Sequence, residues 1–263
     1  MLGKLTKYEL RATMRVFLPL YLAILVTAAF CRVFVHFDFD MSNEILAALS
    51  RIVAFAYGAV LFATFALTLV LLVQRFYKNL LGSEGYLMHT LPVKTWQNIS
   101  AKLIAVVVWI IATMLVVGVS VLMIVGDLAL IRHFFESLPE AMRLLFGDDQ
   151  IWLYLLEGVF ALLTQGIANI LLIYVSLAIG HLFHKHRVAA AVGAYLVIIF
   201  VLGVLLNLAI AGFNLMPWRF WGMFSGESLI HLVLLGGSAL NLLFGAACFF
   251  TTNYILSRHL NLQ

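Results

Sequence analysis

Six long apolar stretches occupy most of this 263-residue chain, and they constrain its fold more than any other feature. A helix needs about 20 predominantly apolar residues to cross the hydrocarbon core of a bilayer, because each backbone amide must be hydrogen-bonded within the segment. The stretches that meet this requirement cover residues 16–37, 45–73, 103–125, 151–183, 188–211 and 229–256. The sequence therefore predicts an all-α integral membrane protein with six transmembrane helices in a single domain over residues 1–263.

Composition excludes an ordinary soluble protein. Hydrophobic residues make up 64% of the chain and charged residues 11%, and the mean hydropathy is +1.08, whereas soluble domains carry roughly 25% charged residues. No A-x-A-like cleavage pattern follows the first apolar run, so we expect that run to be retained as a span. Cys31 and Cys248 lie inside apolar runs and are expected to be small buried side chains.

The distribution of charge predicts the orientation in the membrane. With the N-terminus in the cytosol, eleven of the 16 Lys and Arg residues fall on the cytosolic side, as the positive-inside rule requires. Six spans then return the C-terminus to the cytosol, residues 74–102 form a cytosolic loop, and residues 127–150 form an extracellular loop. The sequence pI of about 9.1 reflects this topology, and we expect no nucleic-acid partner. The stretch 151–183 exceeds a bilayer core, so Glu157 is expected in a projecting outer turn.

Residues 1–15 carry four cations at spacings of three and four, which places them on one face of a helix: Lys4, Lys7, Arg11 and Arg15. The other side is expected to present apolar residues, namely Leu2, Leu5, Tyr8 and Met14. Such a helix would lie along the inner leaflet, where each cation gains about 1 kcal/mol from anionic headgroups. An ordinary basic anchor of the first span is an equal alternative.

The cytosolic loop contains a turn and a return into helix. Residues 82–85 form a Gly-Ser-Glu-Gly turn, residues 86–90 a short amphipathic piece, and Pro92 lies near the first turn of the following helix. A short helix across the ends of two spans is a docking element that a partner protein can push. An interfacial loop that dips into the headgroups has the same composition.

The run from Asn79 to Ala105 resembles the cytosolic loop of permease subunits of ABC-2 type ATP-binding-cassette exporters, especially the small six-span permeases of Gram-positive bacteria. In that family the loop carries a Gly-acid-Gly-Tyr-Leu core and a Thr-Leu-Pro-Val step. The matching residues here are Glu84, Gly85, Tyr86, Leu87, Thr90, Leu91, Pro92 and Val93, and Lys94 follows directly. The outer connection of residues 127–150 is longer than expected for a minimal permease.

The resemblance implies a permease domain in the bacterial cytoplasmic membrane, with an N-terminal elbow helix at residues 1–15 and a coupling helix between the second and third spans. It further implies two permease chains, identical or different, each docked on a separate ATPase through residues 84–95. The chain has no G-x-x-x-x-G-K-[ST] motif, so ATP and Mg²⁺ are expected in the partner, and this chain is expected to bind no cofactor and to be no enzyme. His181, His184 and His186 lack metal-ligand spacing and a nearby acid, so no metal site is predicted.

Polar residues recur within the apolar stretches: Thr64, Thr68, Gln165, Asn169, Asn207 and Asn241. They either line a substrate path or form hydrogen bonds between helices worth roughly 0.6 kcal/mol each, and the second interpretation is favoured. Small residues are expected to allow close helix contacts, namely Gly166, Gly193, Gly203, Gly236, Gly237, Gly245 and Ala189 to Ala191.

The largely apolar interior favours an amphipathic, lipid-like or peptide substrate. Two other functions stay open: the substrate-binding membrane subunit of a vitamin importer, and a non-transporting sensor or immunity subunit of an ABC complex. Ligand binding without an ATPase would indicate the first, and loss of antibiotic tolerance without loss of efflux would indicate the second.

Overall fold

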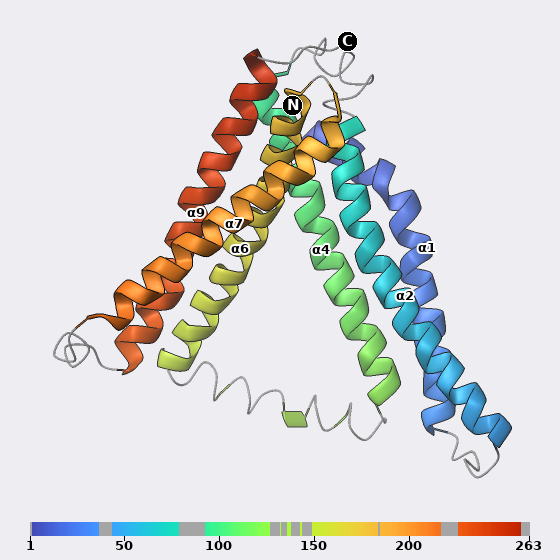
Figure 1. Ribbon diagram of the computed structural model, residues 1–263. Helices are drawn as coiled ribbons and strands as arrows, with labels where there is room; N and C mark the ends of the chain where they lie inside the picture. The colour runs from blue at the N-terminus through green and yellow to red at the C-terminus, as the bar shows by residue number, and fades with distance from the viewer. Residues whose placement is uncertain are drawn as a thin grey trace. The chain divides into compact units, whose positions relative to one another are not determined.

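The described part of the chain consists of six long helices. The computed structural model describes residues 2–36, 44–78, 93–126, 132, 136–137, 143, 149–183, 185–216 and 226–258, and no strand occurs among them. The helices are α1 (Leu2–His36), α2 (Glu44–Phe76), α4 (Thr95–Val125), α6 (Asp149–His181), α7 (Arg187–Asn214) and α9 (Gly226–Arg258) (Figure 1).

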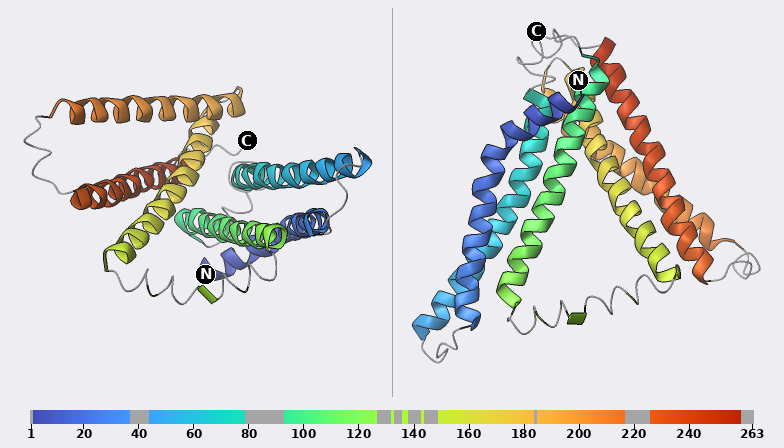
Figure 2. Two further views of the ribbon diagram at one scale, coloured as in Figure 1. Left: turned by 90° about the horizontal axis from the view of Figure 1, so that it is seen from below. Right: turned by 180° about the vertical axis from the view of Figure 1, so that it is seen from behind.

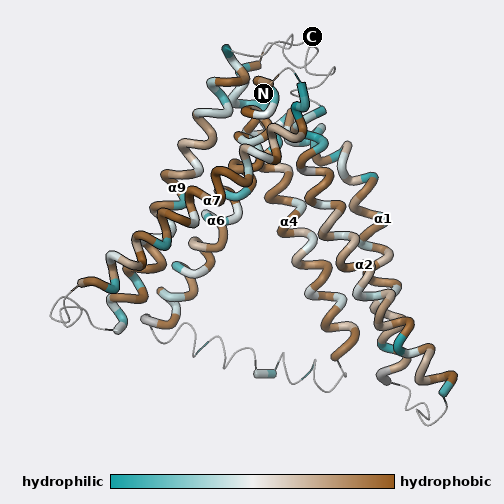
Figure 3. Tube along the Cα trace, viewed as in Figure 1, coloured by the Kyte–Doolittle hydropathy of each residue, from teal (hydrophilic) through white to brown (hydrophobic). Residues whose placement is uncertain are grey.

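All six helices are long and apolar enough to cross a membrane. Figure 3 shows hydrophobic residues along most of each helix. Even the shortest, α7 with 28 residues, extends about 42 Å at about 1.5 Å per residue, compared with about 30 Å for a hydrocarbon core. The prediction of an all-α multi-pass membrane protein with six spans is confirmed.

The first helix is continuous through the boundary that the sequence predicted between residues 15 and 16. A separate elbow helix is therefore not present among the described elements. The first turns of α1 are nevertheless inclined to the rest of the helix in Figure 2 (right). Pro19 lies inside α1, where its ring clashes with the carbonyl of Arg15 and removes one backbone hydrogen bond, which favours a kink.

Helix extends into both ends of the predicted cytosolic segment of residues 74–102, because α2 continues to Phe76 and α4 begins at Thr95, next to the predicted return into helix near Pro92. Gln97 stabilises the early start of α4. Its backbone N–H donates to the carbonyl of Lys94 at 2.9 Å, and its side-chain oxygen accepts from the backbone N–H of Lys94 at 3.3 Å. This return of a side chain to the backbone before the helix is half of a capping box.

The chain divides into two compact units, which we describe separately. The first holds α1, α2 through Gln74 and α4 from Ser100. The second holds residues 75–78 and 93–99 with α6, α7 and α9. The prediction of one domain over residues 1–263 stays a prediction.

The core of the first unit forms where α1 packs against α2 and α4. Its fully buried members are Phe17, Tyr21 and Ile24, and the partly buried residues around them are Tyr57, Val60, Leu61, Leu71, Trp109, Ala112 and Val116. The Phe17 ring stacks on Trp109 with centroids 4.4 Å apart. Hydroxyl groups bridge the helices, since Tyr21 Oη lies 2.8 Å from Thr113 Oγ1 and Tyr57 Oη lies 2.7 Å from Ser120 Oγ.

In the second unit α6 packs against both α7 and α9. A Cβ atom at Gly245 of α9 would lie 3.5 Å from the Leu171 side chain, so this glycine makes the predicted close contact. The other five predicted glycines do not, because a Cβ atom there would meet nothing within 4 Å in the structure described: Gly166, Gly193, Gly203, Gly236 and Gly237. The closest approach instead involves Gly180, which the sequence did not single out.

Candidate functional site

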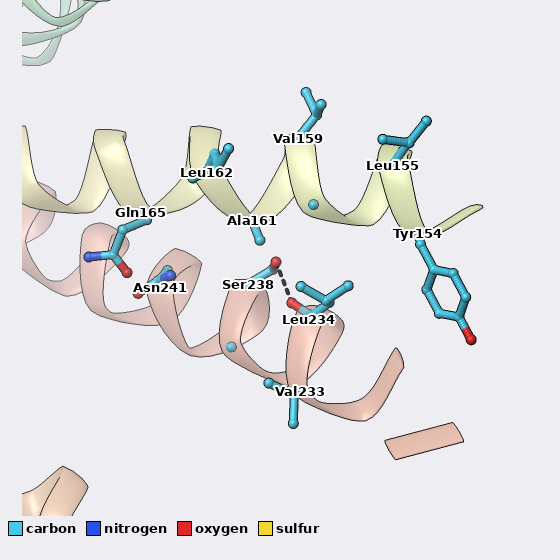
Figure 4. Close-up of a pocket in the computed structure, with 12 residues that line it drawn as sticks. Tyr154, Leu155, Val159, Ala161, Leu162, Gln165, Val233, Leu234, Ser238 and Asn241 are labelled. Carbon is cyan, nitrogen blue, oxygen red and sulfur yellow. Dashed lines mark hydrogen bonds between the residues drawn. The ribbon is translucent and has the colours of Figure 1, made fainter. Parts of the chain in front are cut away.

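A groove of about 550 Å³ lies between α6 and α9 in the second unit (Figure 4). Its walls are mostly apolar, with Leu162 on α6 and Val233 on α9 among them, and it opens to the outside of the unit. Three polar side chains interrupt the apolar lining, namely Gln165, Ser238 and Asn241. The volume lies within the range of about 300–1,000 Å³ that is usual for small-molecule sites.

The amide groups of Gln165 and Asn241 lie on the facing sides of α6 and α9 and point towards each other in Figure 4. Gln165 Nε2 donates to Asn169 Oδ1 at 3.3 Å, and the hydroxyl of Ser238 donates to the carbonyl of Leu234 at 2.6 Å. The side chain of Asn241 makes no hydrogen bond to any residue that the structure describes. Hence the groove offers amide donors and acceptors in the middle of apolar helices.

The structure brings together three of the six polar residues predicted for a substrate path: Gln165, Asn169 and Asn241. Thr64 and Thr68 lie on α2 in the other unit, and Asn207 lies on α7. Thr64 donates to the carbonyl of Val60 at 2.8 Å, and Asn207 to that of Gly203 at 2.8 Å.

The favoured interpretation, hydrogen bonds between helices, was wrong for the five predicted residues whose bonds are described. Thr64, Thr68 and Asn207 each donate to the carbonyl four residues earlier in their own helix, because that carbonyl is within reach of a short polar side chain. Gln165 and Asn169 bond to each other along α6.

Next to the groove, Glu157 of α6 pairs with His231 of α9. Both carboxylate oxygens lie 2.8 Å from His231 Nδ1, and Glu157 is 7% exposed. The two side chains thus share a hydrogen bond between Nδ1 of His231 and the carboxyl group of Glu157. The ring of Tyr154, which also lines the groove, stacks on His231 with centroids 4.6 Å apart.

Glu157 lies in the early turns of α6, buried against α9 through its pairing with His231. Its expected place in a turn that projects beyond the bilayer stays a prediction. Sequence reasoning missed His231, although a useful signal existed, because an acidic residue inside an apolar span requires a nearby partner.

Replacing His231 by Leu is expected to lower the free energy of unfolding by about 2 kcal/mol, because the buried Glu157 carboxylate loses its hydrogen-bond donor. Thermal unfolding of the detergent-solubilised protein, followed by tryptophan fluorescence, measures this change. Adding Glu157→Leu to His231→Leu removes the stranded carboxylate and should recover much of the loss. A single variant as stable as the native protein would show that the pair contributes little.

A second polar contact, which sequence reasoning also missed, joins α1 to α4 in the first unit. Glu9 Oε1 and Lys102 Nζ lie 2.5 Å apart, and their side chains are 10% and 4% exposed. One turn further along α1, Trp109 Nε1 donates to Thr13 Oγ1 at 2.7 Å. These inward-facing residues replace the apolar side predicted for residues 1–15, of which Tyr8 is 70% exposed.

The predicted membrane-surface cations are all exposed on α1: Lys4, Lys7, Arg11 and Arg15. Most residues predicted to contact an ATPase lie outside the described residues, namely Glu84, Gly85, Tyr86, Leu87, Thr90, Leu91 and Pro92. The two that are described, Val93 and Lys94, directly precede α4; Val93 is partly buried and Lys94 is exposed.

Within the described residues, no group of three or more His, Cys, Asp or Glu side chains could hold a metal ion. The absence of a cofactor stays a prediction. The chain matches no family model, no curated protein and no solved structure. The six long apolar helices place the chain in the class of multi-pass all-α membrane proteins. A proposal of a particular family rests on the resemblance of residues 79–105.

Proposed function

We propose that this chain is the membrane-spanning subunit of an ATP-driven exporter of the ABC-2 type, which moves an amphipathic, lipid-like or peptide substrate across the bacterial cytoplasmic membrane. The observation that carries the proposal is the pair of motifs at residues 84–87 and 90–93 in a loop between the second and third of six spans. Two such chains pair, and each receives force from a separate ATPase.

The position of the motif supports force transfer. Val93 and Lys94 lead directly into α4, and the contacts of Gln97 with Lys94 tie the end of the loop to the first turn of the helix. A push that reaches Val93 and Lys94 would therefore pass directly into a helix of 31 residues. Because Lys102 on α4 pairs with Glu9, α1 would move together with α4.

The groove between α6 and α9 supports the substrate class. Apolar walls accommodate acyl or apolar side chains, and the amides of Gln165 and Asn241 match the ester, hydroxyl or amide groups of an amphiphile. A small polar vitamin would need many more polar contacts than this lining supplies. The importer subunit is accordingly the weaker alternative.

The test uses the chain purified with the ATPase that accompanies it and reconstituted into vesicles. Glu84→Lys is expected to abolish substrate-stimulated ATP hydrolysis and export while the protein still inserts into the membrane, because the loop loses its match to the ATPase. A double replacement of Leu91 and Val93 by Gly should act in the same way, since it disfavours helix at the contact.

Glu44→Lys is the matched control, because it makes the same charge change at an exposed residue at the start of α2. Unchanged hydrolysis and export in the loop variants would refute the coupling role. Lost antibiotic tolerance with no measurable export by the native complex would favour the sensor or immunity function instead. Export by the chain alone would exclude an ATP-driven subunit.

A further inference from the structure

The rotation of the first turns of α1 about the helix axis is fixed by its contacts with α4. The Glu9–Lys102 pair and the Trp109–Thr13 hydrogen bond both hold the same side of α1 against α4. The next turn continues the contact, because Phe17 stacks on Trp109. The opposite side of α1 is consequently directed away from α4.

The four cations of residues 1–15 occupy that opposite side. With about 3.6 residues per turn, they lie roughly 160–240° around the axis from Glu9. All four are exposed, and none pairs with an acid among the described residues. Glu9 is the acid of α1, and Lys102 already neutralises it. This side of α1 is therefore positively charged, and no carboxylate of the described residues compensates its charge.

A cleft of about 410 Å³ runs beside this face. It is lined by Leu2, Gly3, Thr6, Lys7 and Leu10 of α1 and by Ile104 of α4. The hydroxyl of Thr6 is engaged with the carbonyl of Leu2 at 3.1 Å, so the cleft offers apolar surface and the Lys7 ammonium group. The lining of the cleft thus combines apolar side chains with the positive charge of Lys7.

We propose that this cleft binds one anionic phospholipid, with its phosphate at Lys7 and the adjacent Lys4 or Arg11, and with an acyl chain between Leu10 and Ile104. Charge complementarity selects an anionic headgroup over a zwitterionic one. The apolar cleft selects a lipid over an acidic protein surface, which would leave Leu2, Leu10 and Ile104 uncovered. A defined lipid site is more specific than a general attraction of the basic residues to a negatively charged membrane surface. The site does not depend on the exporter function.

The test measures how many lipids each purified chain retains, by native mass spectrometry after extraction from vesicles that contain equal amounts of phosphatidylglycerol and phosphatidylcholine. The native chain should retain one phosphatidylglycerol. Lys4→Gln with Lys7→Gln should weaken its binding about 30-fold, from about 1 kcal/mol per cation. Lys185→Gln with Arg187→Gln removes two cations outside α1 and should leave retention unchanged.

A second variant tests the cleft without altering charge. A Cβ atom at Gly3 would meet nothing within 4 Å, so Gly3→Leu fits the fold, favours helix and places a side chain in the cleft. It should displace the bound lipid while the exposed cations remain. Retention of phosphatidylglycerol by this variant, or equal retention of both lipids by the native chain, would overturn the proposal. So would retention of phosphatidylglycerol by the Lys4→Gln, Lys7→Gln variant at the native level.

Discussion

Replacing Glu9 by Ala is expected to lower the free energy of unfolding by about 3–5 kcal/mol, because the replacement removes the carboxylate that pairs with the buried Lys102 ammonium group at 2.5 Å. The cost is large since the Lys102 side chain is only 4% exposed and cannot simply turn into water. Thermal unfolding of the purified protein in detergent, followed by tryptophan fluorescence, measures it.

Two variants give this result its control. Arg15→Ala removes an exposed charge six residues away on α1 and should change stability by less than about 0.5 kcal/mol. Replacing Glu9 by Leu together with Lys102 by Met removes both charges, and it should be far more stable than Glu9→Ala because no buried charge is left unpaired. If Glu9→Ala unfolds like the Arg15→Ala control, the pair is not a stabilising contact.

Hydropathy was sufficient to predict the six spans and the all-α class. The requirement for about 20 apolar residues is a property of the bilayer, so it can be read without knowing which helix contacts which. Element ends were harder to predict. Residues 2–15 continue into α1 without a break. The start of α4 at Thr95 agrees with the return into helix that Pro92 indicated, although hydropathy alone places the apolar run later.

The paired charges could not be predicted because their partners are distant in sequence. Glu9 and Lys102 are separated by 93 positions, and Glu157 and His231 by 74. The spacing of Lys4, Lys7, Arg11 and Arg15 did contain part of the answer, since it places Glu9 on the other side of the helix.

The packing contacts of the small residues could not be predicted from the sequence either. A glycine allows a second helix to approach closely. Whether a neighbouring helix lies at that glycine depends on the three-dimensional arrangement. The sequence singled out Gly193 and not Gly180, whereas the structure gives the close contact to Gly180. A Cβ atom at Gly193 meets nothing within 4 Å, whereas one at Gly180 would lie 2.5 Å from the Ala191 backbone nitrogen.

The Gly180→Val variant is therefore expected to lose about 3 kcal/mol of stability, because its side chain would collide with the Ala191 backbone, which cannot move without displacing the start of α7. Gly180→Ala should be destabilised to a lesser degree. Gly193→Ala is the matched control and should be slightly more stable than the native chain, by up to about 1 kcal/mol, because alanine favours helix. Unfolding temperatures of the three variants, measured in the same detergent, give opposite signs if α6 and α7 approach as closely as the structure shows. A Gly180→Ala variant as stable as Gly193→Ala would mean that the two helices are further apart.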